Sequence, residues 1–460
     1  MAFRAPDRLG GIFRASLAPR REVPVRRSTL VLAVSTLALS LPQGAGSAQQ
    51  RAVTLAEALE LAEKAAPRVV QAAGNAGAAG WSVRAAWGEY LPRLTGGSTY
   101  GTSFSAGPSR TDPITGQVLS GNVSSSSLSL GASASLEIFT GFRRGADLRA
   151  VHAGVLYADA ALAYEKSQSA LNTTGQFLLA LQGADLVRVR QDQIRRAEEK
   201  LAIANAKLVT RAATIADSLQ AVVDLTRART QLLAEERNLT EAEASLARLV
   251  GVDGRVSAVS DSSLFRTVAI ADTAALLAEA MDRSPFVVQA ESQAQSARAQ
   301  LAMLRATYFP NVVLTGSTSF NGSSGNDYQL FNNRSLSLGL QWQLFNGFSR
   351  ERDMSERRAA LDYSVAAAAD ARRQIGANLT TQLAGLGSAE RRMTLTAQSL
   401  EAARASVRVQ TERYRLGSIG IVELNLAQDA LSTAETDAVN ARFDYLRARA
   451  QIEALLGRGL

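Results

Sequence analysis

The chain has 460 residues, a formal net charge of +8, no cysteine and a single histidine, His152. Without cysteine it has no disulfide, thiolate zinc site or cysteine nucleophile, and one histidine is too few for a histidine metal cluster. The sequence also lacks a Walker glycine loop with lysine, a dinucleotide fingerprint and an HExxH motif, so we expect neither an enzyme nor a bound cofactor.

Residues 1–48 have the pattern of a secretory signal peptide. Four arginines between residues 20 and 27 precede an apolar run at 30–41, which is too short to span a bilayer as a helix, and small residues follow as far as Ala48. This leader carries +5 of the net charge, so the rest of the chain is near +3 and has no nucleic-acid-binding character. Two classes remain: a periplasmic protein, or one that crosses an outer membrane by strands.

After this leader the sequence is a tandem duplication. Two segments recur at a shift of 218 residues, and two more recur at a shift of 206. The matching pairs are 67–72 with 285–290, Tyr90-Leu91-Pro92 with Tyr308-Phe309-Pro310, 138–142 with 344–348, and 249–251 with 455–457. We therefore assign a first repeat to residues 49–260 and a second to residues 261–460.

Each repeat opens with a stretch of helical composition. In the first repeat it covers about 55–89, where Thr54 and Glu57 have the spacing of a capping box, and its counterpart covers about 273–307. A Tyr-x-Pro sequence ends both stretches, because proline cannot continue the hydrogen-bond ladder of a helix.

Two strands follow in each repeat, at about 93–105 and 127–139 and at about 311–321 and 335–346. Apolar and polar residues alternate with a period of two, which is typical of a strand with one apolar and one polar face. Strands of about 10–13 residues are long enough to cross a membrane. The polar faces are rich in serine, which suits a crowded, wet lumen better than the surface of a soluble sheet.

Very long helices complete each repeat. No proline occurs between Phe142 and Val209 or between Arg350 and Leu416. The composition predicts helical hairpins with coiled-coil character at about 142–209 and 214–250, and at about 349–416 and 421–457. A helix of about 65 residues is roughly 100 Å long.

In this order and repeated twice, these elements resemble the TolC-type outer-membrane efflux channels. The resemblance rests on Thr54-Leu55-x-x-Ala58-Leu59, on the two Tyr-x-Pro sequences, on Phe139-Thr140-Gly141-Phe142 and its counterpart Phe345-Asn346-Gly347-Phe348, and on 413–424. It implies an α+β membrane protein in which three copies form a 12-stranded β-barrel continued by a periplasmic α-helical barrel. It also implies the exit channel of a tripartite efflux or type I secretion system in the outer membrane.

The strand count requires several copies. Four strands cannot close a barrel, since outer-membrane barrels begin at eight strands, and an open edge in hydrocarbon leaves backbone amides unpaired. Three copies supply enough strands. The implied partners are a periplasmic adaptor, an inner-membrane transporter of the RND or ABC type, and outer-membrane lipid. No nucleic acid is expected.

The resemblance places the functional residues at the hairpin tips. Glu423 and its counterpart Asp217 are candidates for carboxylate rings at the periplasmic mouth, with Leu426 standing where the family often carries a second acid. The alternative is that both carboxylates are ordinary solvated helix residues. The expected adaptor-docking residues are Arg211, Tyr414, Gly417, Ser418 and Gly420; Arg211 stands where the resemblance predicts glycine.

Two rival functions stay open at this point. A periplasmic adaptor also contains a long helical hairpin, but it has one hairpin and no amphipathic strands of membrane length. A structural periplasmic coiled coil has no need of the strands either. Fractionation separates these alternatives, because neither rival belongs in the outer-membrane fraction and the chain has no cysteine to accept a lipid.

Overall fold

The computed structural model describes residues 51–119, 123–266 and 272–459. The expected signal peptide, including its cleavage site near Ala48, lies outside these residues. The first repeat contains β1 (Arg51–Val53), α1 (Leu55–Ala65), α2 (Pro67–Gly88), β2 (Arg93–Ser105), β3 (Arg110–Thr111), β4 (Val118–Leu119), β5 (Val123–Phe139), α3 (Arg143–Val209), α4 (Ile215–Val250) and β6 (Val256–Ala258). The second contains η1 (Ser262–Phe265), α5 (Thr273–Arg283), α6 (Pro285–Leu304), η2 (Arg305–Tyr308), β7 (Asn311–Ser323), η3 (Ser324–Asn326), β8 (Phe331–Gln341), α7 (Ser349–Arg415) and α8 (Ile421–Leu456).

The two repeats have the same helices in the same register. Helices α3 and α4 become α7 and α8 when every residue number is raised by 206, and α1 and β2 become α5 and β7 when it is raised by 218. The shift changes between β2 and β5, where the first repeat contains the additional β3–β4 hairpin. Residues of one repeat can therefore be matched to residues of the other one by one.

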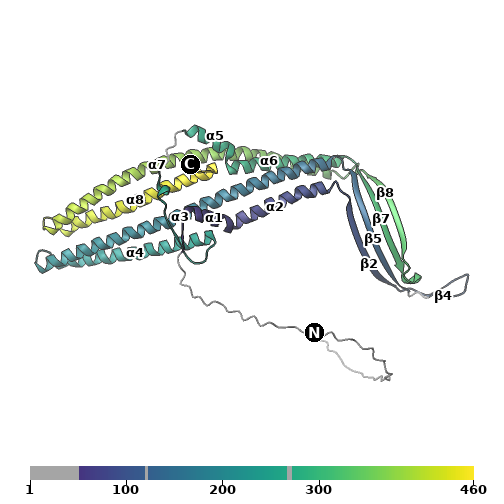
Figure 1. The fold of residues 1–460 in the computed structure, drawn as a ribbon, viewed down its shortest axis with the longest axis horizontal. Coiled ribbons are helices and arrows are strands. Elements are labelled where there is room, and N and C mark those ends of the chain that lie inside the picture. The colour runs from purple at the N-terminus through teal and green to yellow at the C-terminus, as the bar shows by residue number, and fades with distance from the viewer. Residues whose placement is uncertain (1–50, 120–122, 267–271, 460) are drawn as a thin grey trace, which may run out of the picture. The chain divides into compact units, whose positions relative to one another are not determined.

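A four-stranded antiparallel sheet in the order β2-β5-β7-β8 lies at one end of the long helices (Figure 1). Leu130 lies between Ser98 and Phe320, and Leu314 lies between Leu136 and Leu338, so the apolar residues share one face. On the other face hydroxyl side chains bond to one another, as in Thr95–Ser133 at 2.7 Å and Ser317–Ser335 at 2.7 Å. The predicted division into an apolar and a hydroxyl-rich face is therefore present.

The opening helix of each repeat is broken, which differs from the continuous helices expected at 55–89 and 273–307. Helix α1 ends at Ala65 and α2 begins at Pro67; α5 ends at Arg283 and α6 begins at Pro285. Proline lacks an amide hydrogen and disfavours helical backbone in the residue before it, so each helix stops there and a new one starts. At the start of α1 the Thr54 half of the capping box is present, whereas the Glu57 carboxylate pairs with Arg51.

The last strand was predicted too late in the sequence. It was expected at 335–346, but β8 covers Phe331–Gln341. Its partner β7 begins at Asn311, directly after Pro310, and proline has no amide to extend the ladder. Beyond the strand Arg350 donates to the carbonyl oxygens of Gln343 and Leu344, at 3.2 and 3.1 Å, which turns the chain into α7.

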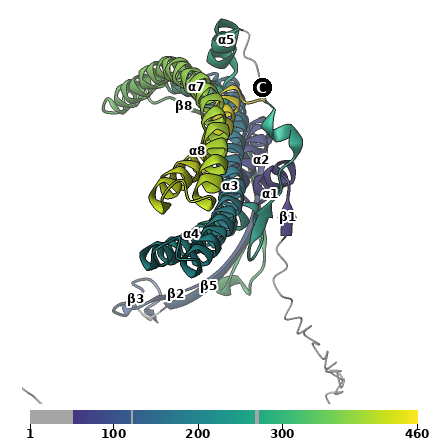
Figure 2. The same ribbon diagram turned by 90° about the vertical axis from the view of Figure 1, so that its left-hand side faces the viewer.

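The long helices form a curved wall (Figure 2). Helices α3 and α8 pack against each other in its middle, with α4 against α3 and α7 against α8. The main core lies where the two hairpins meet the opening helices, and its largest fully buried side chains include Phe177, Phe443 and Ile452. This leaves the outer faces of α2, α4 and α7 at the edges of the chain.

Candidate functional site

Both hairpin tips have the same backbone turn. In the first tip the Ala212 amide donates to the Lys207 carbonyl at 2.8 Å, and in the second the Ser418 amide donates to the Arg413 carbonyl at 2.9 Å. Each turn needs one residue in the left-handed region, which is Gly417 with φ +79° in the second tip and Arg211 with φ +58° in the first. A non-glycine residue there costs about 1–2 kcal/mol, so the departure noted at Arg211 is accommodated by strain rather than by a different fold.

The two candidate carboxylates have different surroundings. Asp217 caps α4: its Oδ2 accepts from the Thr214 amide and hydroxyl, both at 2.9 Å, while the Thr214 hydroxyl accepts from the Asp217 amide. Glu423 has the same position in α8, but its N-cap residue is Gly420, which has no hydroxyl, and its side chain is exposed. Asp217 is thus held in a structural role that Glu423 does not share.

Glu423 and Leu426 lie on one exposed face of α8. They are three residues apart, a spacing that places side chains on the same side of a helix, and Leu426 is 66% exposed. In a single chain this face therefore presents a carboxylate beside an apolar side chain in the first two turns of the helix.

Tyr414 is buried inside the tip. The prediction that its side chain lies on the docking surface is therefore wrong. Its side chain is 3% exposed and packs with Ile421, Leu424 and the small residues of the other hairpin. Lys207 covers its ring, with Nζ 4.2 Å from the centroid, and donates to its carbonyl oxygen. Burial, together with the negative charge of Asp217, raises the pKa of the Tyr414 phenol above its ordinary value, which favours the neutral form.

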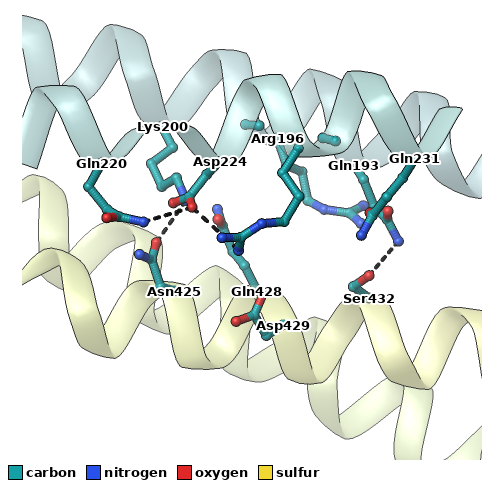
Figure 3. Close-up of a pocket in the computed structure, with 13 residues that line it drawn as sticks. Gln193, Arg196, Lys200, Gln220, Asp224, Gln231, Asn425, Gln428, Asp429 and Ser432 are labelled. Carbon is teal, nitrogen blue, oxygen red and sulfur yellow. Dashed lines mark hydrogen bonds and ion pairs between the residues drawn. The ribbon is translucent and has the colours of Figure 1, made fainter. Parts of the chain in front are cut away.

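Farther from the tips along the helices, the buried ammonium group of Lys200 joins three helices. Lys200 of α3 is 4% exposed, and its Nζ donates to Asp224 Oδ2 of α4 and to Asn425 Oδ1 of α8, each at 2.7 Å (Figure 3). Gln220 donates to the second carboxylate oxygen of Asp224 at 2.9 Å. A buried cation with two hydrogen-bond acceptors links the first hairpin to the second, and a substitution that removes one charge leaves its partner unpaired.

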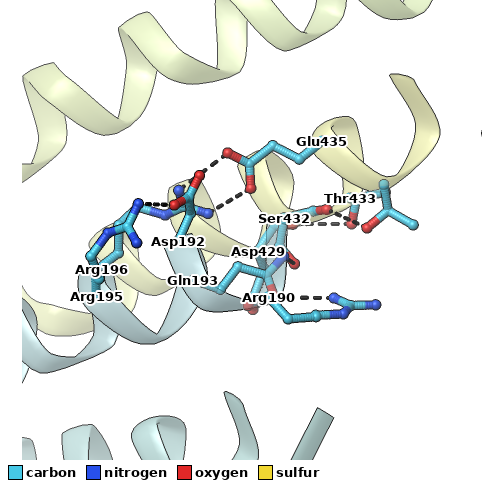
Figure 4. A network of polar contacts seen from close by, with 10 residues as sticks. Arg190, Asp192, Gln193, Arg195, Arg196, Asp429, Ser432, Thr433 and Glu435 are labelled. Atoms are coloured by element: carbon cyan, nitrogen blue, oxygen red, sulfur yellow. Dashed lines mark hydrogen bonds and ion pairs between the residues drawn. The ribbon is translucent and has the colours of Figure 1, made fainter. Parts of the chain in front are cut away.

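Further polar bridges follow along the same seam (Figure 4). Arg196 makes a bidentate pair with Glu435 at 2.6 and 3.1 Å, and Gln193 donates to Ser432 at 2.6 Å. Sequence reasoning missed these residues. A signal was available, because the buried positions Gln193, Ala197, Lys200 and Ala204 have the alternating spacing of four and three residues that marks a coiled-coil seam.

Neither a metal centre nor a membrane-spanning helix is found over the described residues. No cluster of three or more histidine, aspartate or glutamate side chains has the arrangement of a metal site there. Within the same residues no helix combines the length and apolar composition needed to cross a bilayer.

Comparison with known proteins gives concordant matches. The model of a family described as outer membrane efflux protein matches residues 58–252 and 276–458. The pyoverdine export outer membrane protein OpmQ of Pseudomonas aeruginosa is 26% identical over 345 residues, 72% of this chain and 70% of OpmQ. Protein CyaE of Bordetella pertussis is 30% identical over 249 residues, 53% of this chain and 52% of CyaE.

Solved structures show the same fold. The CmeC outer membrane channel of Campylobacter jejuni superposes with a TM-score of 0.73 at 15% identity, over 88% of this chain and 85% of CmeC. At this identity the likeness speaks for the fold alone. It confirms the predicted combination of two tandem repeats, antiparallel strands and long helical hairpins.

Proposed function

Because the chain belongs to the outer membrane efflux protein family, we propose that three copies of it form the exit duct through which an inner-membrane pump discharges its substrates. The protein is an outer-membrane efflux channel of tripartite efflux or type I secretion, a conduit without enzymatic activity whose helices extend into the periplasm. We place the boundary between its repeats at residues 260 and 261, between β6 and η1.

One observation carries the assembly of several copies into a ring: the sheet of a single chain has two open edges. Strands β2 and β8, of 13 and 11 residues, each pair on one side only among the described strands. An unpaired edge in hydrocarbon costs several kcal/mol per backbone group. Joining β8 of one copy to β2 of the next in a closed ring removes all edges; membership of the family sets the number of copies at three, which gives an even strand number above the minimum of eight.

The tips are the proposed docking surface for a periplasmic adaptor, which connects the duct to an RND or ABC transporter. Arg211, Gly417, Ser418 and Gly420 are exposed and carry this role, whereas Tyr414 supports the tip from inside. The apolar face of the sheet contacts outer-membrane lipid. Glu423 and Leu426 form the constriction, with Asp217 holding the start of α4 beside it.

Replacing Gly417 by leucine should abolish export while trimers still reach the outer membrane. No described atom lies within 4 Å of a Cβ at Gly417, and the first tip already carries Arg211 in the same backbone conformation, so the fold should tolerate the change at a backbone cost of about 1–2 kcal/mol. The matched control is Gly385→Leu in the middle of α7, where a Cβ also meets open space. Export and outer-membrane trimer are measured in both; normal export in the Gly417 variant would remove this tip from the docking surface.

Replacing Glu423 by glutamine should weaken block of the channel by divalent or trivalent cations added from the periplasmic side. A ring of carboxylates attracts cations, and a ring of leucines restricts flow by dewetting. Leu426→Ala should therefore raise the resting conductance instead. Single-channel recording separates the two effects, with Glu401→Gln on exposed α7 as the control. If neither variant differs from the unmodified protein, both side chains point away from the lumen.

A further inference from the structure

The hydroxyl-rich face of the sheet has its charge concentrated at one end. Strand register places the odd-numbered residues of β2, β5, β7 and β8 on this face. Among those that the structure describes, two are charged: Arg93, the first residue of β2, and Glu137, near the end of β5. Both lie where the sheet joins the long helices, so the face beyond them is an uncharged surface of small polar side chains.

Glu137 has its countercharge within the chain. Its Oε2 lies 2.9 Å from Nη2 of Arg143, the first residue of α3, and the same guanidinium lies 3.9 Å from the carboxylate of Glu89. Arg144 donates to the carbonyl oxygen of Glu137. Two carboxylates and two guanidinium groups thus balance one another at the elbow between β5 and α3.

Arg93 is left without such a partner. Its side chain is exposed, and it forms no ion pair with any other residue that the structure describes. The carboxylates of the elbow, Glu89 and Glu137, face Arg143 instead, and the residue opposite Arg93 in β5 is the neutral Ser135. Each chain therefore places one unneutralised positive charge on the hydroxyl-rich face.

The second repeat builds the same elbow without these charges. Four charged residues of the first repeat have neutral counterparts at the shifts of 218 and 206. These pairs are Glu89 and Thr307, Arg93 and Asn311, Glu137 and Gln343, and Arg143 and Ser349. The fold of a strand, an elbow and a long helix is therefore compatible with a neutral side chain at each position.

The arginine that supports the elbow is present in both repeats. Arg144 and its counterpart Arg350 donate to the carbonyl oxygens of the matching residues Glu137 and Gln343. Each guanidinium also covers a tyrosine ring, with its Cζ 5.0 Å from the ring centroid in the first repeat and 4.6 Å in the second. Support of the backbone thus explains Arg144 and Arg350, but it does not explain Arg93.

We propose that Arg93 makes the barrel select anionic substrates, because the three Arg93 side chains of a trimer form a ring of positive charge at the periplasmic end of an uncharged sleeve. This inference rests on the proposed trimeric duct and adds a substrate class to it. A ring of charged side chains favours ions of the opposite sign. Arginine is charged at every working pH and matches the geometry of carboxylate and phosphate groups, so small molecules that carry these groups pass most easily.

The ratio of chloride to potassium permeability tests the ring. It is obtained from the reversal potential of the reconstituted channel in a KCl gradient. Arg93→Asn, which introduces the residue of the second repeat, should lower the ratio roughly twofold near 0.1 M salt, where the Debye length is about 10 Å, and should have little effect near 1 M, where it is about 3 Å. A merely structural role of Arg93 predicts no such dependence on salt.

Two further variants change the charge in the opposite direction. Asn311→Arg adds a second arginine per chain at the matching position of β7, which is exposed, and leaves Arg93 in place. Glu137→Gln copies Gln343 and removes one negative charge beside the ring. Each should raise the chloride-to-potassium ratio at low salt, so the inference remains testable if Arg93→Asn fails to assemble.

Arg334→Asn is the matched control. Arg334 lies in β8 opposite Thr318, on the other face of the sheet, and is exposed. This variant loses the same charge by the same substitution, yet it should leave the ratio unchanged. All ratios are compared with that of the unmodified channel, because Glu423 at the other end of the duct contributes a preference of the opposite sign to each of them.

The outcomes separate this inference from the function on which it rests. An equal effect of Arg334→Asn and Arg93→Asn overturns the anion ring but leaves the duct. Ratios that stay at the unmodified value in Arg93→Asn, Asn311→Arg and Glu137→Gln channels do the same. An unmodified protein that forms no conducting trimer in a bilayer overturns the proposed function and the ring together.

Discussion

Replacing Lys200 by methionine should lower the free energy of local unfolding of the α3–α4 hairpin by about 3–5 kcal/mol, the cost of leaving a buried charge without its partner. The Lys200 side chain is 4% exposed, and its Nζ lies 2.7 Å from the carboxylate of Asp224, whose side chain is 14% exposed. The change leaves Asp224 with its hydrogen bond from the Gln220 amide and with the Arg227 guanidinium 3.9 Å away. Native-state hydrogen exchange of α3 and α4 measures the effect.

The matched control is Lys64→Met. Lys64 and Glu60 are 2.6 Å apart, but both side chains are 70% exposed. Water screens such an exposed pair, so the loss there should be small beside the loss at Lys200. Adding Asp224→Leu to Lys200→Met should recover part of the loss, because no unpaired charge then remains buried. Equal, small losses at Lys200 and Lys64 would show that the buried pair has no special role in joining the hairpins.

Local rules explain why the elements could be predicted. The proline-free helices end at turns where one residue adopts the left-handed conformation, Arg211 in one tip and Gly417 in the other, and strand alternation placed the apolar residues on one face. The errors were local too. Pro67 and Pro285 were placed inside stretches expected to be continuous helices, although proline breaks the hydrogen-bond ladder there, and the pairing limit at Pro310 was not applied to β8.

The seam between the hairpins was missed for a different reason. Helix α3 changes partners along its length, from α2 and α6 near the sheet to α4 and α8 toward the tips (Figure 1). Its buried face therefore has no single hydrophobic stripe, and Arg196 and Lys200 resemble solvated residues until the facing helix is known. Tyr414 was misplaced in the same way, since a tyrosine beside a turn gives no sign that a lysine covers its ring.

Replacing Leu130 by arginine should destabilise the barrel by about 2–4 kcal/mol per copy, the cost of a lipid-facing arginine near the bilayer midplane. Leu130 lies in the middle of β5, between Ser98 and Phe320 on the apolar face. Its substitution turns a charge toward hydrocarbon, where neither water nor a described counterion is close. The temperature at which the folded trimer loses its compact migration on a semi-denaturing gel measures the loss.

The adjacent Ser129 provides the contrast, because successive residues of a strand point to opposite faces. Its hydroxyl donates to Asn321 Oδ1 at 2.8 Å on the hydroxyl-rich face. Ser129→Arg should leave the thermal stability nearly unchanged, because a wet lumen hydrates the guanidinium. The three added positive charges should instead reduce cation conductance through the barrel. Equal destabilisation by both substitutions, with conductance unaltered, would show that the faces of the sheet are not divided between lipid and lumen.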